Sequence, residues 1–482
     1  MIDKSSCRKK KWTLWLYAGI MILSGCSYLE SDQGEHVAGS DIIIEKDTEE
    51  EIEQGPTAPN LSPEDITIEP LQLPELATET LTVNPEIVIA SDIHYLAKEL
   101  TDFGNAFQEM AGNEDGKMVP YVWEIMDAFL DQVIKKRPQV LILAGDLTLN
   151  GERVSQEVLA QELERVETAG IPVVVIPGNH DINNVKAASY KGDDRVPAEP
   201  TSPEQFAKIY ENFGYKEALS RDPSSLSYLY ELIDGTWLLM LDSCQYEKGA
   251  MVGGMIRTDT YQWMDEQLNQ AWEEGRRVIA VAHHNLLDES KVYVKDCTIE
   301  HAEELEQKLD EWGVGLFLSG HLHVQHYKSS IDYDIDEIVT SALSIAPCQY
   351  GVLQFFGPEN YFYRTEITDV SAWAERKGNP DQNLQDFEWY AQDFLHKEFY
   401  KDAFRELEGR ELDTQDIKEM AELYAELNVQ ATAGKAFEIR DFIQQEYSYK
   451  LWQEYDRTSI LAMYMDELLE DAVVDYNERR RP

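Results

Sequence analysis

The chain has few basic residues. Its 482 residues include 42 Lys and Arg against 91 Asp and Glu, which gives a formal net charge of −49 at pH 7. Proteins bind nucleic-acid polymers by neutralising phosphates with Lys and Arg, so this shortage excludes a polynucleotide partner. A small anionic substrate is still compatible with the composition if bound metal ions make its pocket locally positive.

The N-terminus lacks an apolar run long enough to cross a bilayer. The stretch Trp12–Leu23 is shorter than the ~20 residues that a membrane-spanning helix needs. It follows the basic run Arg8–Lys11, and together they have the proportions of a secretory signal. The stretch ends in Leu23–Cys26 (LSGC), which resembles the lipobox of bacterial lipoproteins. That resemblance implies that residues 1–25 are a lipoprotein signal peptide. Cys26 would then carry a lipid that anchors the chain to the outer face of the bacterial cell membrane. An ordinary signal peptide with a chance cysteine is the alternative.

Cysteine is scarce, at five residues. Cys7 would leave with the signal peptide, and Cys26 would be lipidated. The remaining Cys244, Cys297 and Cys348 are odd in number, so at most one disulfide can form among them, and their spacing does not choose a pair. We expect three buried thiols.

Composition divides the rest of the chain into three regions. Residues 26–82 are acidic, rich in Pro, Thr and Glu and poor in aromatics, which predicts a disordered tether because too little apolar surface can be buried. Residues 83–368 alternate strand-like and helix-like segments, typical of an α/β fold. Residues 369–482 carry apolar side chains at helical spacing and no strand-like run, which predicts a separate all-α domain that could support an oligomer or form a lid.

Metal-ligating side chains follow five apolar runs that read as buried strands. The runs are EIVIAS, VLILAG, VVVIPG, VIAVA and GLFLSG. Ligands of such sheets gather at the carboxyl ends of the strands, so these side chains are expected to meet. The clusters, in order, are Asp92 with His94, Asp146, Asn179 with His180 and Asp181, His283 with His284, and His321 with His323.

Imidazole, carboxylate and amide oxygen together suit divalent cations such as Mn²⁺, Fe²⁺ and Zn²⁺. A pair of such ions in a hydrolytic site needs one carboxylate that reaches both. Asp146 follows Gly145, which lets the backbone approach closely, and so is the candidate bridge. The pairs Asp92/His94 and His321/His323 are spaced by two, so each pair points the same way if the extended backbone persists beyond its strand.

As a set, these clusters resemble the calcineurin-like metallophosphoesterase family over about residues 85–350. The resemblance implies a two-layer mixed β-sandwich flanked by helices across residues 83–368, with two metal ions at one edge. It assigns the first ion to Asp92, His94, Asp146 and His323, and the second to Asp146, Asn179, His283 and His321. It implies Mn or Fe, with Zn as an alternative.

The resemblance also implies roles beside the metals. His180 and Asn179 would contact the substrate phosphate, and Asp181 would hydrogen-bond His180 and fix its tautomer. A hydroxide bridging the ions would attack phosphorus in line, with His180 as proton donor. The family often has His-His-Pro-Pro where this chain has His283-His284-Asn285-Leu286, so His284 remains an alternative ligand.

Other residues are weaker candidates. Tyr95 follows His94 and would stack on a base or ribose, or else pack in the core. His326 would line the pocket or lie on the surface. The Gly253-Gly254 pair would approach a phosphate or form a turn, and Asp242-Ser243 would support the site from a neighbouring strand end.

Within the family, the SDIHYL, AGDLTLNGE and PGNHDINN segments and the domain layout are similar to class III cyclic-nucleotide phosphodiesterases found as bacterial lipoproteins. We therefore expect hydrolysis of small phosphodiesters, with 3′,5′-cyclic nucleotides as the first choice. The alternatives are a general phosphomonoesterase or nucleotidase, an envelope glycerophosphodiester hydrolase, and a surface binding lipoprotein with a vestigial site.

Overall fold

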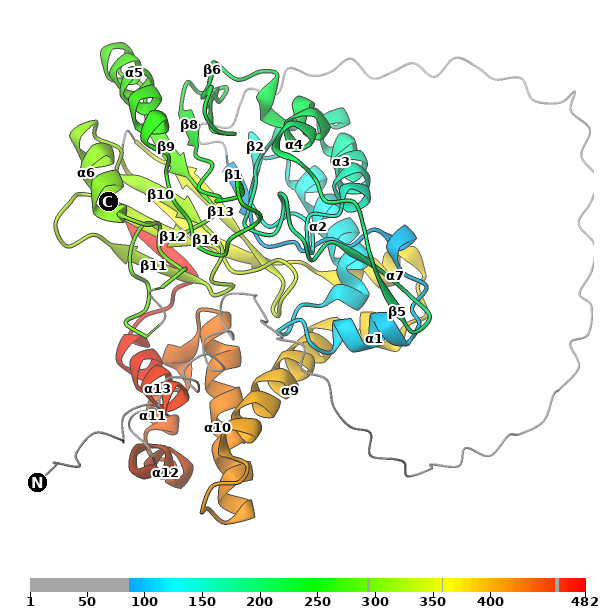
Figure 1. The fold of residues 1–482 in the computed structure, drawn as a ribbon. Coiled ribbons are helices and arrows are strands. Elements are labelled where there is room, and N and C mark those ends of the chain that lie inside the picture. Colours follow the sequence, from blue (N-terminus) through cyan, green and yellow to red (C-terminus); the bar gives the residue numbers. More distant parts are fainter. Residues whose placement is uncertain (1–85, 293–294, 358, 456–458) are drawn as a thin grey trace, which may run out of the picture. The chain divides into compact units, whose positions relative to one another are not determined.

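A computed structural model describes residues 86–292, 295–357, 359–455 and 459–482 (Figure 1). The expected signal peptide, Cys26 and the acidic tether lie outside these residues. Across the described ranges, no helix is both long and apolar enough to span a bilayer.

The first sheet has the strand order β15-β14-β13-β1-β2-β3. Strands β1, β2 and β3 run parallel, whereas β13, β14 and β15 pair in antiparallel fashion. The parallel strands are almost wholly buried, as expected for apolar runs covered on both faces. The strands are β1 (Glu86–Ala90), β2 (Val140–Ala144), β3 (Val173–Ile176), β13 (Gln349–Phe355), β14 (Tyr361–Ile367) and β15 (Glu478–Arg481).

The second sheet has the order β11-β12-β10-β9-β8-β7-β6, with β12, β10, β9 and β8 parallel. A small hairpin, β4 (Ala188–Lys191) with β5 (Asp194–Pro197), lies apart from both sheets in its hydrogen bonding. The strands of the second sheet are β6 (Ser220–Arg221), β7 (Tyr228–Glu231), β8 (Trp237–Met240), β9 (Val278–Val281), β10 (Leu316–Ser319), β11 (His326–Ser329) and β12 (Asp336–Val339).

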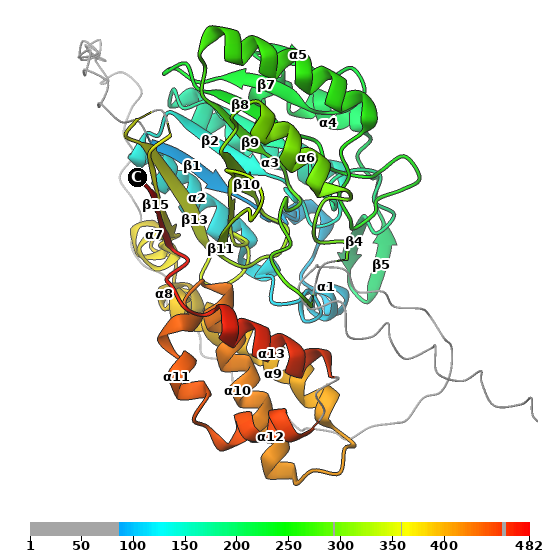
Figure 2. The same cartoon turned by 90° about the vertical axis from the view of Figure 1, so that its left-hand side faces the viewer.

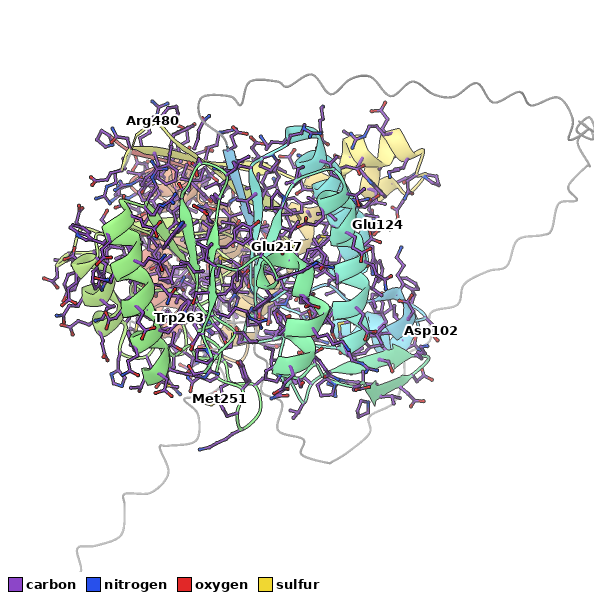
Figure 3. The ribbon with its side chains drawn as sticks, turned by 90° about the horizontal axis from the view of Figure 1, so that it is seen from above. Asp102, Glu124, Glu217, Met251, Trp263 and Arg480 are labelled. Atoms are coloured by element: carbon purple, nitrogen blue, oxygen red, sulfur yellow. The ribbon has the colours of Figure 1, made fainter. Side chains whose placement is uncertain are left out.

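Helices cover the outer faces of both sheets. Apolar side chains of α5 and α6 form one cluster with β8, β9 and β10, and those of α2 and α3 pack with the first sheet. Seen from above, Trp263 of α5 and Glu124 of α2 lie on opposite sides (Figure 3). The prediction of two mixed sheets with flanking helices is confirmed. These helices are α1 (Asn105–Ala111), α2 (Val122–Lys136), α3 (Arg153–Thr168), α4 (Pro203–Ile209), α5 (Thr258–Glu274) and α6 (Ala302–Glu311), with short turns η1 (Lys98–Leu100), η2 (Val119–Tyr121) and η3 (Glu211–Tyr215).

The C-terminal region is helical from residue 370, as predicted (Figure 2). The long helices α9 and α10 pack against each other, and their aromatic side chains serve mainly as core. The helices are α7 (Val370–Lys377), α8 (Gln382–Gln385), α9 (Phe387–Leu407), α10 (Thr414–Thr432), α11 (Arg440–Ile443), α12 (Tyr447–Tyr455) and α13 (Ile460–Asp471), with the turn η4 (Ala436–Glu438).

One detail of the predicted C-terminal domain is wrong. The chain does form a strand after residue 369, because β15 pairs with β14 of the first sheet. The segment Glu478–Arg481 reads ERRR and has no apolar alternation. Two of its arginines instead pair with acidic groups, Arg479 with Asp336 at 3.0 Å and Arg481 with Asp334 at 2.6 Å. Within the described residues, the buried side chains of the helical region form one continuous cluster with those of the first sheet.

The three cysteines within the described residues are buried free thiols, and no disulfide joins them. Burial raises the pKa of the Cys297 thiol to about 12. These thiols therefore act as small apolar core groups at neutral pH.

Candidate metal centre

The five predicted strands are β1, β2, β3, β9 and β10, and each ends next to one of the expected clusters. Gly145, at the end of β2, has a φ of +90°, and a Cβ there would lie 2.6 Å from the His283 ring. The close approach expected just before Asp146 is therefore present. It leaves room for an imidazole from the other sheet.

The paired donors do not converge by strand alternation, because the extended backbone on which that prediction depended does not persist beyond the strands. Asp92 and His94 have φ values of 55° and 49°, and His321 and His323 have 71° and 61°. These left-handed conformations are costly for residues other than glycine and gather at functional sites. Backbone bonds hold them: the Asp92 N–H donates to Gly145 O at 3.1 Å, and the His321 N–H donates to Asp92 Oδ2 at 3.0 Å.

The first group of donors consists of Asp92, His94, Asp146 and His323, whose ligand atoms all lie within 4.8 Å of one another. All four side chains are buried. His323 Nε2 lies 3.2 Å from Asp92 Oδ1 and 3.2 Å from His94 Nε2. Two imidazole nitrogens and a carboxylate oxygen thus face a single point, which matches the ligand set expected for the first ion.

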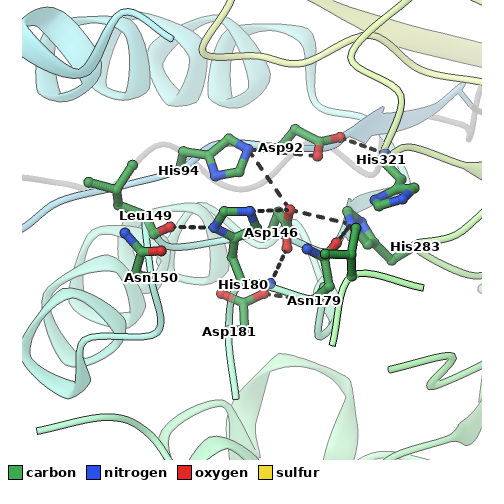
Figure 4. A network of polar contacts seen from close by, with 12 residues as sticks. Asp92, His94, Asp146, Leu149, Asn150, Asn179, His180, Asp181, His283 and His321 are labelled. Atoms are coloured by element: carbon green, nitrogen blue, oxygen red, sulfur yellow. Dashed lines mark hydrogen bonds and ion pairs between the residues drawn. The ribbon is translucent and has the colours of Figure 1, made fainter. Parts of the chain in front are cut away.

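The second group lies on the other side of Asp146 (Figure 4). His283 Nε2 is 3.4 Å from Asp146 Oδ2 and 3.0 Å from Asn179 Oδ1. The ring of His321 lies 5.1 Å from that of His283. Asp146 Oδ2 is also 3.9 Å from His94 Nε2, so this one carboxylate stands between both groups.

His283 and His284 differ in the groups that their ring nitrogens contact. His283 turns Nδ1 to Ala144 O at 2.9 Å and leaves Nε2 facing Asp146. His284 has Nδ1 on Ser243 Oγ at 2.7 Å and Nε2 on Val252 O at 2.8 Å. His284 lies close enough to His283 and His321 to count as a donor by distance. The Nε2 atom of His283 contacts Asn179 and Asp146, which are themselves candidate ligands, whereas both nitrogens of His284 contact groups outside the candidate set, so we favour His283 as the ligand.

The ring nitrogens that do not face the centre fix the orientations of His321 and His283. His321 Nε2 lies 2.9 Å from the backbone carbonyl of Asp296, which leaves Nδ1 as its donor atom. His283 is held in the same manner by Ala144 O. A carbonyl that accepts the second N–H sets the tautomer of a metal-binding histidine.

The electrostatics of the site fit a bound cation. Burial acts to raise the pKa of Asp146, but His283 and His180 hold it well below its usual range. Burial opposes protonation of His283, yet Asp146 raises its pKa to about 9. A proton on His283 thus supplies the positive charge that a bound cation would supply. Asp92 Oδ1 is buried and lies 3.2 Å from His323 Nε2 and 3.9 Å from His94 Nε2. A buried carboxylate oxygen that faces two imidazole nitrogens fits a cation site.

His180 lies where expected, but Asp181 does not hold it. His180 Nδ1 lies 2.6 Å from Leu149 O, and Nε2 faces the centre at 3.9 Å from Asp146 Oδ2. Asp181 points away and accepts hydrogen bonds from the backbone or side chains of its neighbours. The predicted Asp181–His180 bond is therefore wrong, because the Leu149 carbonyl occupies that position. The donors to Asp181 are Leu147 N, Thr148 N, Thr148 Oγ1, Gly178 N and Gln156 Nε2, at 2.9–3.0 Å.

Tyr95 is not beside the centre. Its ring is buried and borders a cavity of about 380 Å³ that none of the candidate ligands lines. Burial and the nearby Glu162 raise the pKa of its hydroxyl. The predicted contact of Tyr95 with substrate is wrong, and its alternative, a packing role, holds.

The other weak candidates take supporting positions. Ser243 bonds His284, as expected of a supporting residue. Gly254 packs against the His284 ring, where a Cβ would collide with the ring Cγ, so this glycine serves close packing. His326 neither lines the site nor lies free on the surface, since it is ion-paired with Glu289 and Asp471.

Several supporting residues had no signal in the sequence. Asp296 acts through its backbone carbonyl, so its side-chain type is irrelevant to His321. Ser344 donates its hydroxyl to Asp92 O at 2.7 Å from a loop that carries no ligand. Gln156, on α3, bonds Asp181 from an ordinary helical position. Only the fold brings these groups to the site.

Comparison with known proteins adds relatives of two kinds. The chain is 26% identical over 228 residues to serine/threonine-protein phosphatase CPPED1 of Homo sapiens, covering 45% of this chain and 62% of that protein. It is 28% identical over 194 residues to "Probable cyclic nucleotide phosphodiesterase" of Synechococcus sp., covering 39% and 59%. The chain thus spans less than two thirds of the length of these relatives. A dimetal phosphatase of Danio rerio aligns with a TM-score of 0.43 and 12% identity over 59% of this chain and 97% of that one.

Two family profiles match the chain. Residues 369–475 match the C-terminal domain of cyclic nucleotide phosphodiesterase. Residues 85–325, half of the chain, match the calcineurin-like phosphoesterases and contain every candidate ligand. The chain therefore belongs to the calcineurin-like phosphoesterase family and carries a candidate site for two metal ions between its two sheets.

Proposed function

We propose that the protein is a phosphodiesterase that hydrolyses small phosphodiesters, with 3′,5′-cyclic nucleotides as its preferred class. The observation that carries this proposal is the match of residues 369–475 to the C-terminal domain of cyclic nucleotide phosphodiesterase. That match lies on the same chain as the buried donor set around Asp146. The relative named as a cyclic nucleotide phosphodiesterase adds support.

We propose that Mn²⁺ or Fe²⁺ is held by Asp92, His94, Asp146 and His323, and a second such ion by Asp146, Asn179, His283 and His321. Carboxylate, amide and imidazole donors suit these ions. When bound, two divalent ions held by these residues would supply a nucleophilic water at neutral pH and would neutralise charge on the phosphate oxygens. Metal analysis of the purified protein tests this assignment, and fewer than two ions per chain would contradict it.

His180 is suited to act on the leaving oxygen. Because its Nδ1 is held by Leu149 O, the Nε2 atom is the one that faces the centre. Burial lowers the pKa of His180, although Asp146 opposes this. The Nε2 proton is therefore retained only beside negative charge, such as that of a phosphate. In that state His180 can donate the proton to the departing alkoxide. Exchange of His180 for Ala should slow esters with poor leaving groups more than esters with good ones.

The buried setting supports the same chemistry. The candidate ligands are nearly inaccessible to solvent, with His94 and His283 at 0% exposure. Charges in such a site interact more strongly than in water. The left-handed residues Asp92 and His94 are fixed by backbone bonds before substrate arrives, so little reorganisation is needed at the moment of reaction.

A substrate panel tests the proposal. Purified protein supplied with Mn²⁺ is compared on bis-p-nitrophenyl phosphate, mono-p-nitrophenyl phosphate and 3′,5′-cyclic AMP. The expected result is faster turnover of the diesters. A strong preference for the monoester would contradict the diesterase proposal and favour a phosphomonoesterase, the second candidate. The relatives named as serine/threonine-protein phosphatases are the observation behind that second candidate.

We also propose that the chain is held on the outer face of the bacterial cell membrane by a lipid on Cys26. The basic run Arg8–Lys11, the apolar stretch Trp12–Leu23 and the LSGC sequence support this. Labelled palmitate should enter the wild-type protein in cells and should not enter a Cys26→Ala variant. Label in both, or in neither, would contradict the anchor.

A further inference from the structure

Lys117 is a buried lysine without a hydrogen bond. Its side chain is fully buried, and its Nζ atom has no hydrogen-bond partner in the part of the chain that the structure describes. The nearest carboxylate oxygen is Glu114 Oε2, at 3.9 Å. Lysines are almost never fully buried unless they are closely paired, because the ammonium loses its hydration. Three unused N–H donors in the interior call for an anionic partner.

The loop that carries Lys117 lies against the metal centre. It runs from Gly112 to Met118, between α1 and η2. The Met118 N–H donates to Ser344 O at 2.7 Å, and the Ser344 hydroxyl donates to Asp92 O at 2.7 Å. Two bonds thus link the residue after Lys117 to a candidate ligand.

The positive charge of Lys117 acts on His94 and His180. Burial is the main cause that lowers the pKa of His94, and the positive charge of Lys117 is the next. The same charge also lowers the pKa of His180. The rings of His94 and His180 lie 4.9 Å apart, edge to face, and Figure 4 shows them side by side. The place of Lys117 beside the centre rests on its burial and on the Met118–Ser344–Asp92 link.

We propose that Lys117 binds a non-bridging oxygen of the phosphate group that occupies the centre. This proposal rests on the proposed function only in that a phosphate occupies the site. It holds equally for a diester, a monoester or inorganic phosphate. A buried ammonium is a strong partner for such an oxygen, because charge-assisted hydrogen bonds gain most in a dry site.

Glu114 does not already fill this role. Its carboxylate is beyond hydrogen-bond distance from Lys117 Nζ, and its side chain is 20% exposed. Burial raises the pKa of Glu114 even with Lys117 nearby. A loose pair of this kind leaves the ammonium available to a better-placed anion.

The C-terminal helical region holds this loop in place. Gly116 has a φ of +82°, and a Cβ there would collide with Leu395 of α9. Lys401, also on α9, donates its ammonium to Gly112 O at 2.9 Å. Figures 1 and 2 both show α9 beside α1, from which the loop departs. The helical region thus supports the residue that we assign to phosphate binding.

Phosphate binding tests the proposal directly. The full-length protein is loaded with Mn²⁺ and titrated with inorganic phosphate by calorimetry, for wild type, Lys117→Met, Lys117→Arg and a control, Lys308→Met. Lys308 lies on α6 and pairs with Asp265 at 2.8 Å, away from the site. We expect Lys117→Met to weaken phosphate binding about tenfold or more, since a buried charge partner is lost. Lys117→Arg should retain part of the affinity, and the control should match wild type.

Each outcome decides the proposal. Metal content is measured in parallel and should stay the same in Lys117→Met, with the KM for the ester rising more than kcat falls. Unchanged phosphate affinity in a folded, metal-loaded Lys117→Met overturns the assignment, as does a wild type that binds no phosphate. If Lys117→Met does not fold, the double variant Lys117→Met/Glu114→Gln removes both charges, and the same comparison is made with it. A wild type that binds phosphate through Lys117 but cleaves no diester overturns the proposed function alone.

Discussion

His326 should make the stability of this protein depend on pH in a defined window. Its Nε2 lies 2.6 Å from Asp471 Oδ2, its Nδ1 contacts the buried Glu289 carboxylate, and its ring lies 4.0 Å from that of Tyr476. Burial alone would lower the pKa of His326, but Glu289 and Asp471 raise it to about 9. The histidine lies on β11 and Asp471 on α13, so this pair joins the second sheet to the C-terminal helices.

The size of the effect follows from the pKa. The usual pKa of His is 6.5 and the folded value is about 9, and each tenfold change in proton affinity is worth about 1.4 kcal/mol. Because the pKa is raised in the folded state, the stabilisation is complete below pH 6.5 and is lost as the pH rises through about 9. The difference of about 2.5 between the two pKa values corresponds to a loss of about 3–4 kcal/mol in the free energy of unfolding between these limits.

The assay is urea unfolding of the wild type and of a His326→Gln variant, followed by tryptophan fluorescence at several pH values. The difference in the free energy of unfolding between the two proteins should be largest at pH 6 and should shrink towards pH 10. Glu337 faces Glu289, and burial raises its pKa to about 8, so both proteins lose stability from that group as the pH rises. Subtraction removes this shared contribution. A difference that stays constant over the whole range would refute the assigned ion pair.

Three further outcomes are expected. Asp181→Asn should destabilise the protein by about 2–4 kcal/mol, because an amide cannot accept all five of the bonds that the carboxylate accepts. A loss of activity at unchanged stability would instead indicate that Asp181 acts by orienting His180. His283→Ala should lose bound metal and His284→Ala should keep two ions, as metal analysis would show; the reverse would exchange their assignments. Glu467, which accepts from the Ser290 hydroxyl and two backbone N–H groups of the loop leading to Asp296, should matter for metal affinity. Glu467→Ala should weaken it about 10–100-fold, whereas Glu470→Ala, at an exposed pair, should not; equal effects would contradict the role of the loop.

The sequence was sufficient to predict where the donors meet. Buried β-branched runs of four to six residues read as strands, and ligands of a parallel sheet gather at one set of strand ends. That reasoning places Asp146 between the groups of His94 and His283, as the structure has it. The layered α/β architecture follows from the same runs, because each strand needs a helix or a second sheet to cover it.

The local geometry at those strand ends could not be predicted. The left-handed conformation of Asp92 and His94 depends on bonds to residues some 50 positions away, which no local pattern contains. The partner of His180 is a backbone carbonyl, that of Leu149, and a carbonyl carries no signature in the side-chain sequence. The same limit applies to Asp296 and His321.

The burial of Lys117 could not be predicted from the sequence for a different reason. The segment GNEDGK reads as a polar turn between helices, and every residue in it is ordinary for a solvent-exposed loop. Its burial arises because α9 covers the loop from one side while Ser344 binds it from the other. Two regions more than 200 residues away therefore decide the environment of this lysine. Composition alone would have assigned it to the surface.

The strand β15 restricts how the C-terminal helices can move relative to the first sheet. The chain leaves the first sheet at the end of β14, forms α7–α13 and returns to the adjacent position of the same sheet. In topological terms the helices are an insertion tied down at both ends, so they cannot swing away as a hinged appendage would. Simple truncation after residue 370 would also strip an edge strand and bare the hydrogen-bonding groups of Tyr361–Arg364, a template for aggregation. To excise this module cleanly, Thr368 should be joined to Asn477 through a short linker, so that β15 stays in its sheet.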